Sequence, residues 1–588
     1  SVLCGSREFP VKDPFVELVK GSLNTFLNAM TYPDKTIYPV ASCHDKDFQN
    51  LMHVYLDAVF YPNIYENESI FRQEGWHYEM ESLEDELTVN GVVYNEMKGA
   101  FSSPDDVVER EIMNSLYPDI TYGLESGGDP DEIPELTYEE FLAFHQKYYH
   151  PSNSYIYLYG NFDAAEYLTF LDEEYLADFE ALNVDSEVGL QKPFEAPREL
   201  VKQYPVMEED PVEENAYLAY NVSMGNSLDK KLYVAMEVLD YVLCSAPGAP
   251  VKQALIDRGI GKDVYSSMEN GIYQPYFSVV AKNAGETRKD EFVAVIEEVL
   301  SKAAKEGLDR KALTAAINYF EFKYREADYG PYPKGLMLGL QALDSWLYDK
   351  RQPFMHIEAN ETFQELRDSI ETGYFEELIR SCMLENPHKA YLTVIPVPGL
   401  TTQKDRALAK KLGALKETLS EDRRREIVEG TKALRAYQEE PDSPEALRTI
   451  PLLKREDMKK EAASYVNEVR SADGTTILFH DIFTNGIGYL NLVFDLGRVP
   501  ERLFPYVGIL KSVLTMVDTE HFGYGELFNE VNLHTGGIRV SANTYTNAGD
   551  MKKYKAKLEI RSKALYGKRD KALELMKEIL LTSRFEDT

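Results

Sequence analysis

The chain has 588 residues, of which 44% are hydrophobic, and this is enough apolar material for about four globular domains. Lys and Arg number 63 against 99 Asp and Glu, and the resulting net charge of −36 disfavours binding to nucleic acid or to anionic membranes. The same charge would attract basic peptides, although an acidic surface that only aids solubility explains it equally well.

The cysteines and the hydropathy pattern favour a soluble protein of a reducing compartment. The four cysteines are too few and too scattered for a disulfide framework or a Cys-x-x-Cys metal site: Cys4, Cys43, Cys244 and Cys382. No apolar run reaches the roughly 18 residues that a membrane-spanning helix requires. We therefore expect a cytoplasmic location, although a signal or transit peptide cannot be assessed from this sequence.

The first third of the chain predicts helices packed on short strands. Ser1–Lys20 contains a short helix, and the β-branched and alternating pattern of Gly21–Ser42 predicts a hairpin. Apolar residues recur at helical spacing over Asp47–Tyr61, and a second helix is predicted over Tyr138–Tyr149. Tyr155–Tyr159 is predicted as a strand that completes the first sheet.

An internal repeat is the main signal of architecture. The pattern strand, helix, helix, returning strands occurs at Ala216–Asn221, Leu228–Leu243, Ala249–Arg258 and Val264–Lys282, and again at Gly488–Asp495, Arg502–Val517, Gly525–His534 and Ile538–Thr546. The predicted fold class is therefore α+β, with helices packed on mainly antiparallel sheets in repeated units.

A charged, helix-prone stretch separates the two copies of the repeat. Lys404–Gln438 is broken at T-L-S-E-D, where Ser420 can cap a second helix. We expect an antiparallel helical hairpin that joins two halves of the molecule, and a simple charged spacer is the alternative.

One carboxylate stands out within Gly91–Ala100, which reads G-V-V-Y-N-E-M-K-G-A. On a helix, Glu96 shares a face with Gly99 and Ala100, and these small residues would let a neighbouring helix come close. A carboxylate in such surroundings is paired, protonated or bound to a cation, whereas a solvated glutamate is the common alternative.

The histidines do not supply partners for this carboxylate. No two of the ten histidines are four positions apart, so the sequence contains no H-x-x-E-H motif. His145 and His150 are five apart and lie on different helix faces, and we expect both to be structural.

Three stretches together resemble the presequence proteases, a branch of the insulinase/pitrilysin family of zinc metallopeptidases: Glu17–Ser42, Gln73–Glu79 (Q-E-G-W-H-Y-E) and Gly91–Gly99 (G-V-V-Y-N-E-M-K-G). The resemblance implies insulinase-type units and one zinc ion per full-length protein. In that family an inverted H-x-x-E-H motif supplies two histidine ligands and a general-base glutamate, and a glutamate in N-E-M-K-G is the third ligand. Glu96 matches this third ligand.

The resemblance also implies where the other functional residues lie. A segment like S-V-L-C-G-S follows the family's histidine motif, so we expect the two histidines and the general base upstream of Ser1 and no catalytic residue in this chain. Asn28 and Ala29 match positions that bind the substrate backbone at a sheet edge. Glu74 and His77 could orient a zinc ligand, or they could be ordinary structural polar residues.

These inferences divide the chain into four parts. We expect a first insulinase-type unit at 1–190 without its N-terminal strands and zinc helix, a second at 195–400, a helical hairpin linker at 401–447, and a third, C-terminally incomplete unit at 448–588. The expected function is that of a fragment of a monomeric zinc endopeptidase that degrades unfolded, basic peptides in a closed two-half chamber. The fragment itself would be inactive, with zinc absent or weakly bound, and a non-catalytic peptide-binding or scaffold subunit is the alternative.

Overall fold

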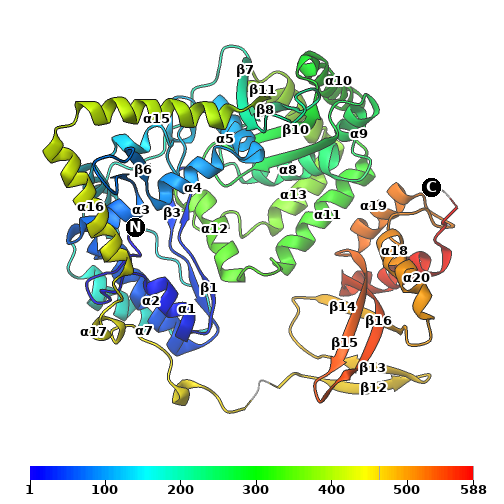
Figure 1. The fold of residues 1–588 in the computed structure, drawn as a ribbon. Coiled ribbons are helices and arrows are strands. Elements are labelled where there is room, and N and C mark those ends of the chain that lie inside the picture. Colours follow the sequence, from blue (N-terminus) through cyan, green and yellow to red (C-terminus); the bar gives the residue numbers. More distant parts are fainter. Residues whose placement is uncertain (462–463, 587–588) are drawn as a thin grey trace.

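The computed structural model describes residues 1–461 and 464–586, so residues 462–463 and 587–588 of the predicted third unit lie outside it. The α+β class is confirmed, because helices pack on open and mainly antiparallel sheets (Figure 1). We call residues 1–190, 195–400 and 448–586 the first, second and third units.

The second unit contains a five-stranded sheet in the order β7-β11-β8-β10-β9. Its strands are β7 (Arg198–Val206), β8 (Ala216–Ser223), β9 (Asp263–Glu269), β10 (Tyr276–Ala284) and β11 (Lys389–Pro398). β11 runs parallel to β7, and the other neighbouring strands are antiparallel. Every residue of β8 is buried, which indicates that both faces of the sheet are covered.

Helices of two units cover the two faces of this sheet. One face packs on helices of the second unit: α8 (Lys230–Asp240), α9 (Pro250–Asp257), α10 (Lys289–Glu306), α11 (Arg310–Glu326), α13 (Asn360–Ser369) and α14 (Tyr374–Leu378). The other face packs on α5 (Pro104–Leu116) of the first unit, through Val108, Ile112 and Leu116. The first and second units therefore share a core.

The first unit consists of helices and three small ladders. β1 (Asn24–Leu27) pairs with β4 (Val40–Ser42), β2 (Met30–Thr31) with β3 (Thr36–Ile37), and β5 (His77–Glu79) with β6 (Thr88–Asn90). Its remaining helices are α1 (Pro14–Gly21), α2 (Asp45–Phe60), α3 (Glu68–Glu74), α4 (Val92–Ala100), α6 (Tyr138–Tyr148) and α7 (Ala164–Leu171). The predicted hairpin and the predicted helices at 47–61 and 138–149 are confirmed.

The strand predicted at 155–159 is wrong. The segment is extended, but no strand of the described chain pairs with it. Its alternate tyrosines lie along α12 (Lys334–Trp346) instead: the ring of Tyr155 packs edge-on against Trp346, with centroids 4.8 Å apart. The rings of Tyr157 and Tyr159 cover Gly339 and Gly335 of the same helix. An alternating pattern marks one buried side of an extended segment, and a helix can supply that cover as well as a sheet.

The linker is helical, but the predicted antiparallel hairpin is wrong. α15 (Leu400–Thr418) and α16 (Glu421–Glu439) meet at Ser420, whose Oγ accepts a hydrogen bond from the Arg423 amide at 3.2 Å. The two helices then diverge, and both lie on the first unit rather than on each other (Figure 1). The apolar residues near the bend explain this geometry, because Leu412, Ile427 and Val428 are buried against Met80 and Leu87 of the β5–β6 hairpin. The short helix α17 (Pro444–Leu447) follows.

The third unit repeats the topology of the second. Its sheet has the order β14-β16-β15, from β14 (Ile487–Asp495), β15 (Ile538–Asn547) and β16 (Asp550–Leu565), with α18 (Phe504–Val513) and α19 (Tyr524–His534) between the first two strands. In the second unit β8, α8, α9, β9 and β10 follow one another in the same way, and the last strand again lies in the middle. The predicted repeat of strand, helix, helix and strands is therefore confirmed.

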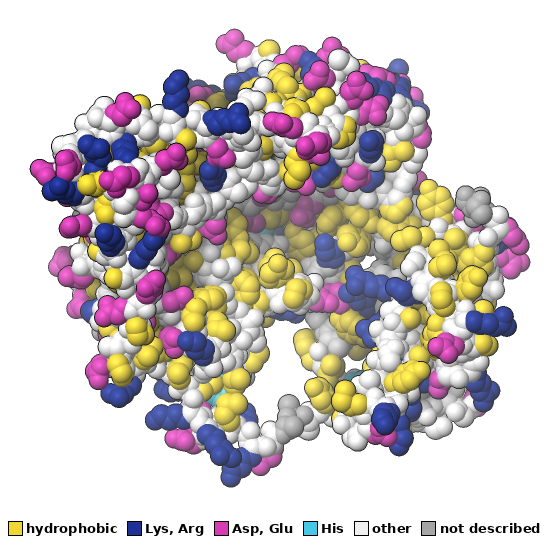
Figure 2. All heavy atoms as spheres, viewed as in Figure 1, with side chains coloured by type: hydrophobic (Ala, Val, Ile, Leu, Met, Phe, Trp, Pro, Cys, Tyr) yellow, Lys and Arg dark blue, Asp and Glu magenta, His cyan; other side chains and the backbone are white. Residues whose placement is uncertain are grey.

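The third unit contacts the second through α19, which packs on α11. It also contains the hairpin β12 (Glu468–Ala472) and β13 (Thr475–Phe479) and ends with α20 (Arg569–Thr582). On the face shown in Figure 2 the molecule is hollowed between this unit and the other two, and hydrophobic side chains line much of the hollow.

Candidate functional site

Helix α4, which carries Glu96, starts at a tightly packed glycine. Gly91 has φ +153°, and a Cβ on it would lie 2.2 Å from the carbonyl oxygen of Gly75. Next to it, Oδ1 of Asn90 accepts hydrogen bonds from the Gly91 amide at 2.8 Å and from Nδ2 of Asn95 at 2.7 Å. These contacts fix the first turn of α4 and the residue that precedes Glu96.

Glu96 itself is exposed, which corrects the expectation that it faces another helix. Gly99 does not mark a close approach either, since no heavy atom outside its own helix lies within 4 Å of the position its Cβ would take. The small residues of this motif are therefore open to solvent, and the Glu96 carboxylate is accessible to a ligand.

Glu74 ends α3, which contacts α4. It accepts a hydrogen bond from Nε2 of Gln73 at 2.9 Å. It also lies beside Cys4, where burial together with the Glu74 charge raises the pKa of the thiol to about 12. The structure thus places Glu74 next to the first residues of the chain (Figure 1).

His77 lies on β5, opposite Asn90 of β6. Its Nδ1 donates a hydrogen bond to the carbonyl oxygen of Arg72 at 2.7 Å, and this bond fixes the ring. The residue lines a cavity of about 320 Å³ between the β5–β6 hairpin, the start of α4, and α16, with Glu79, Asn95 and Arg435 among its other walls.

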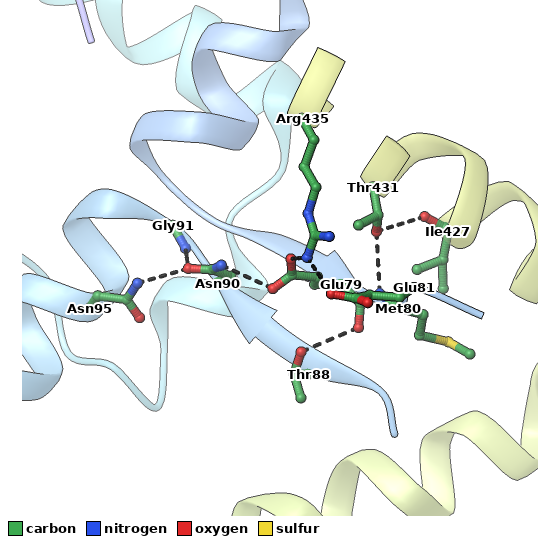
Figure 3. Close-up of polar contacts among 10 residues, drawn as sticks. All are labelled: Glu79, Met80, Glu81, Thr88, Asn90, Gly91, Asn95, Ile427, Thr431 and Arg435. Atoms are coloured by element: carbon green, nitrogen blue, oxygen red, sulfur yellow. Dashed lines mark hydrogen bonds and ion pairs between the residues drawn. The ribbon is translucent and has the colours of Figure 1, made fainter. Parts of the chain in front are cut away.

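A polar cluster at this cavity joins the first unit to the linker (Figure 3). Nη2 of Arg435 lies 2.9 Å from Oε1 of Glu79 and 2.7 Å from Oε1 of Glu81. Nδ2 of Asn90 donates to Oε2 of Glu79 at 2.9 Å. Burial acts to raise the pKa of Glu79, but the hydrogen bond from Asn90 and the charge and hydrogen bond of Arg435 lower it overall.

A second hydrogen-bonded contact lies one helical turn away. Oγ1 of Thr431 accepts from the Met80 amide at 3.2 Å and donates to the carbonyl oxygen of Ile427 at 3.0 Å. Sequence reasoning missed Arg435 and Thr431, because both are ordinary residues of a charged helix and their partners lie more than 350 positions away.

Asn28 and Ala29 are both exposed and link β1 to β2. The Asn28 amide donates to the carbonyl oxygen of Pro39 at 3.2 Å, and the Ala29 amide donates to Oδ1 of Asn28 at 2.9 Å. Within the described chain β1 pairs with β4 alone, so its other edge has no partner strand. The structure therefore places both residues beside an open sheet edge, and their role in binding stays a prediction.

The remaining histidine predictions are confirmed. His145 is buried, with its Nε2 3.0 Å from the Val59 carbonyl oxygen and its Nδ1 2.8 Å from the Tyr65 hydroxyl. Nδ1 of His150 accepts from the Ser152 amide at 3.1 Å and caps a turn. Both residues are structural.

The side chains described do not by themselves form a zinc site. A catalytic zinc ion needs three protein ligands and one open position. In residues 1–461 and 464–586 no group of three or more His, Cys, Asp and Glu side chains is placed to hold a metal ion. Glu96 on its own offers one carboxylate.

Two family models match the chain. The model described as "Peptidase M16 inactive domain" matches residues 135–320, and a model for the region associated with subfamily C of the M16 peptidases matches residues 394–588. The first match covers much of the second unit, and the second begins within β11 and continues through the linker and the third unit.

Curated relatives match over the full chain. It is 48% identical over 587 residues to "Protein HypA" of Clostridium perfringens, covering 100% of this chain and 60% of the relative. It is 39% identical over 595 residues to "Presequence protease 1, chloroplastic/mitochondrial" of Arabidopsis thaliana, covering 100% of this chain and 55% of the relative. The chain thus spans little more than half the length of these relatives.

Solved structures agree with the fold. A crystal structure of pitrilysin aligns over 100% of this chain and 57% of its own, with a TM-score of 0.50 at 14% identity. A protease from Helicobacter pylori aligns over 67% of this chain and 87% of its own, with a TM-score of 0.52 at 13% identity. The chain belongs to the M16 peptidases, as a presequence-protease-like member. Among its described helices, none has the length and apolar character needed to cross a membrane.

Proposed function

We propose that this chain is part of a zinc-dependent endopeptidase that degrades unfolded peptides, and that it holds the peptide as an added strand beside β1. The open edge of β1, with exposed Asn28 and Ala29 at its end, is the observation that carries this proposal. Such an edge binds an extended chain through main-chain hydrogen bonds, which suit substrates of many sequences. Membership of the M16 peptidases supports peptide cleavage as the reaction.

In this proposal Glu96 is one ligand of the zinc ion. Its exposure on a helix whose first turn is held by Gly91 and Asn90 supports that role. Two further ligands and a general base are needed, and we expect them upstream of Ser1. With one ligand the 588-residue chain alone would bind zinc weakly at most and would not cleave peptides.

The charge and shape of the molecule support a preference among peptides. A net charge of −36 favours basic ones by long-range attraction. The hollow between the third unit and the rest of the molecule supports a chamber that selects by size (Figure 2). We propose that the protein acts there as a monomer and binds neither nucleic acid nor membranes.

The test is a binding measurement with two forms of one peptide. A fluorescently labelled basic peptide is titrated with the chain, and its anisotropy is compared with that of the same sequence carrying N-methyl groups at alternate residues. N-methylation removes main-chain donors but keeps the side chains and the charge. We expect the unmodified peptide to bind at least about tenfold more tightly. Equal affinities would show that binding does not use a sheet edge.

A non-catalytic, peptide-binding subunit is the second candidate. The open edge of β1 favours it as well, because strand addition holds a peptide without the help of a metal ion. Zinc analysis of a protein extended upstream of Ser1 separates the two candidates, because only the peptidase would then contain one zinc ion per molecule.

A further inference from the structure

The turn between β2 and β3 carries two charged residues that are buried in the second unit. The turn is closed by a hydrogen bond from the Tyr32 amide to the Lys35 carbonyl oxygen at 2.8 Å. The Asp34 side chain has no exposed surface, and that of Lys35 is 7% exposed. Charged residues at a hairpin tip are normally solvated, so their burial here requires specific partners.

Asp34 has a full set of partners. Its Oδ1 lies 3.1 Å from Nζ of Lys35, and its Oδ2 accepts hydrogen bonds from the hydroxyls of Tyr122 at 2.6 Å and Tyr348 at 2.5 Å. Tyr348 follows α12 of the second unit, and Tyr122 follows α5. Burial and the charge of Asp34 raise the pKa of both tyrosines, so both hydroxyls stay protonated and donate.

Lys35 and the backbone of the turn are bound from another side. Nζ of Lys35 donates to the carbonyl oxygen of Gly271 at 2.8 Å, in the loop between β9 and β10. Oγ1 of Thr121 donates to the carbonyl oxygen of Pro33 at 2.8 Å. Three separate segments of the chain, at 121–122, 271 and 348, therefore hold the tip of the hairpin.

The loop at 271–273 is itself held by the same tyrosines. The Tyr273 ring stacks on Tyr348, with centroids 4.4 Å apart and planes 8° from parallel. The Tyr273 amide donates to the Tyr122 hydroxyl at 2.8 Å. The receptor for the turn is thus a connected network with one geometry.

The base of this hairpin is the open edge described above. β2 and β3 pair through only two residue pairs, Met30 with Ile37 and Thr31 with Thr36. A ladder this short is not stable by itself in water. The position of Asn28 and Ala29, which lie directly before β2, must therefore depend on how the tip of the hairpin is anchored.

We propose that Asp34 and Lys35 are positioning residues for peptide binding: their buried contacts with Tyr122, Tyr348 and Gly271 hold the edge at 28–31 in the place where an extended peptide can pair with it. This inference rests on the proposed function. It adds that peptide affinity is set in part by a contact between the first and second units that the peptide itself never touches.

The decisive variants are Lys35→Met and Asp34→Asn. Each keeps the approximate shape of the side chain but removes a charge and leaves buried partners unsatisfied. Lys553→Met is the matched control, because Lys553 pairs with Asp550 at 3.3 Å at the exposed start of β16. Binding of the labelled basic peptide, hydrogen exchange of residues 24–31 and circular dichroism are measured for each protein.

We expect Lys35→Met and Asp34→Asn to weaken peptide binding by about tenfold or more and to speed exchange at 24–31, with the control unchanged. Tyr348→Phe, which removes one hydroxyl and is less disruptive to folding, should weaken binding by about threefold. Folded variants with wild-type affinity and wild-type exchange at 24–31 would overturn the inference. If the wild-type chain binds no peptide, the proposed function fails, whereas faster exchange at 24–31 in the variants would still establish the anchor.

Discussion

Arg435 of α16 and Glu79 of β5 lie 356 positions apart in sequence and form an ion pair of 2.9 Å. The same guanidinium reaches Glu81, and Asn90 connects Glu79 to the start of α4 (Figure 3). The linker helix is thus bonded to the hairpin that precedes the helix of Glu96.

Replacing Arg435 should loosen this hairpin. In Arg435→Met we expect faster hydrogen exchange in β5, β6 and the first turn of α4, by about fivefold at most because the pair is partly exposed. Arg425→Met is the control, since Arg425 pairs only with Glu421 on the outer face of the same helix in the described structure. Equal exchange in the two variants would mean that α16 is held by its apolar contacts alone.

Two glycines of the Glu96 motif should respond in opposite ways to alanine. Gly91→Ala would place a Cβ against the Gly75 backbone at an unfavourable φ, and we expect a loss of about 2 kcal/mol or more in unfolding free energy. Gly99→Ala meets no neighbour within 4 Å and should stabilise the protein by about 0.5 kcal/mol through helix propensity. Urea unfolding followed by circular dichroism measures both, and a destabilised Gly99→Ala would show that a partner packs on this face.

Metal binding should depend on Glu96 only when the other ligands are present. We expect the 588-residue chain to hold less than one zinc ion, and a protein extended upstream through an H-x-x-E-H motif to hold one. In that longer protein Glu96→Gln should reduce zinc affinity by about tenfold or more, because a direct ligand matters at least as much as the groups that orient it. Elemental analysis and cleavage of a fluorogenic basic peptide measure the effect, with the exposed Glu139→Gln as control. Stoichiometric zinc in the short chain would place the site elsewhere.

The buried Asp344 should make stability depend on pH. Burial raises its pKa to about 7, and the Tyr233 hydroxyl donates to it at 2.8 Å. Because the folded state binds this proton more tightly than the unfolded state, the stabilisation is fully present below about pH 4 and is lost as the pH rises towards 7.

Replacing Asp344 by Asn should remove this dependence. Between pH 5 and pH 8 we expect the wild-type chain to lose about 2 kcal/mol more unfolding free energy than Asp344→Asn. Urea titrations at the two pH values measure the difference, and the exposed Asp368→Asn should behave as the wild type does. Parallel pH profiles for wild type and Asp344→Asn would contradict the assignment.

Local pattern was a sound guide to the type and order of the elements. The period of apolar residues placed the helix at 47–61, and the recurrence of strand, helix, helix and strands predicted a shared topology for β8 to β10 and β14 to β16. These features depend on contacts between residues close in sequence and on one buried face, which a single stretch of sequence records.

Errors arose wherever the partner of an element decided the outcome. The alternating tyrosines at 155–159 pack on α12 rather than in a sheet, and α15 and α16 bury their apolar residues on the β5–β6 hairpin rather than on each other. In both cases the sequence records which side is buried but not what covers it.

By itself the sequence determined the α+β class, the repeated units and the family, because residue type and spacing carry that information locally. The tertiary structure alone decided that Glu96 is exposed, that Arg435 bonds to Glu79, and that Asp34 and Lys35 are buried. Whether a charged side chain is solvated or enclosed depends on residues far away in sequence that fold against it, and nothing in its immediate neighbours reports that distant cover.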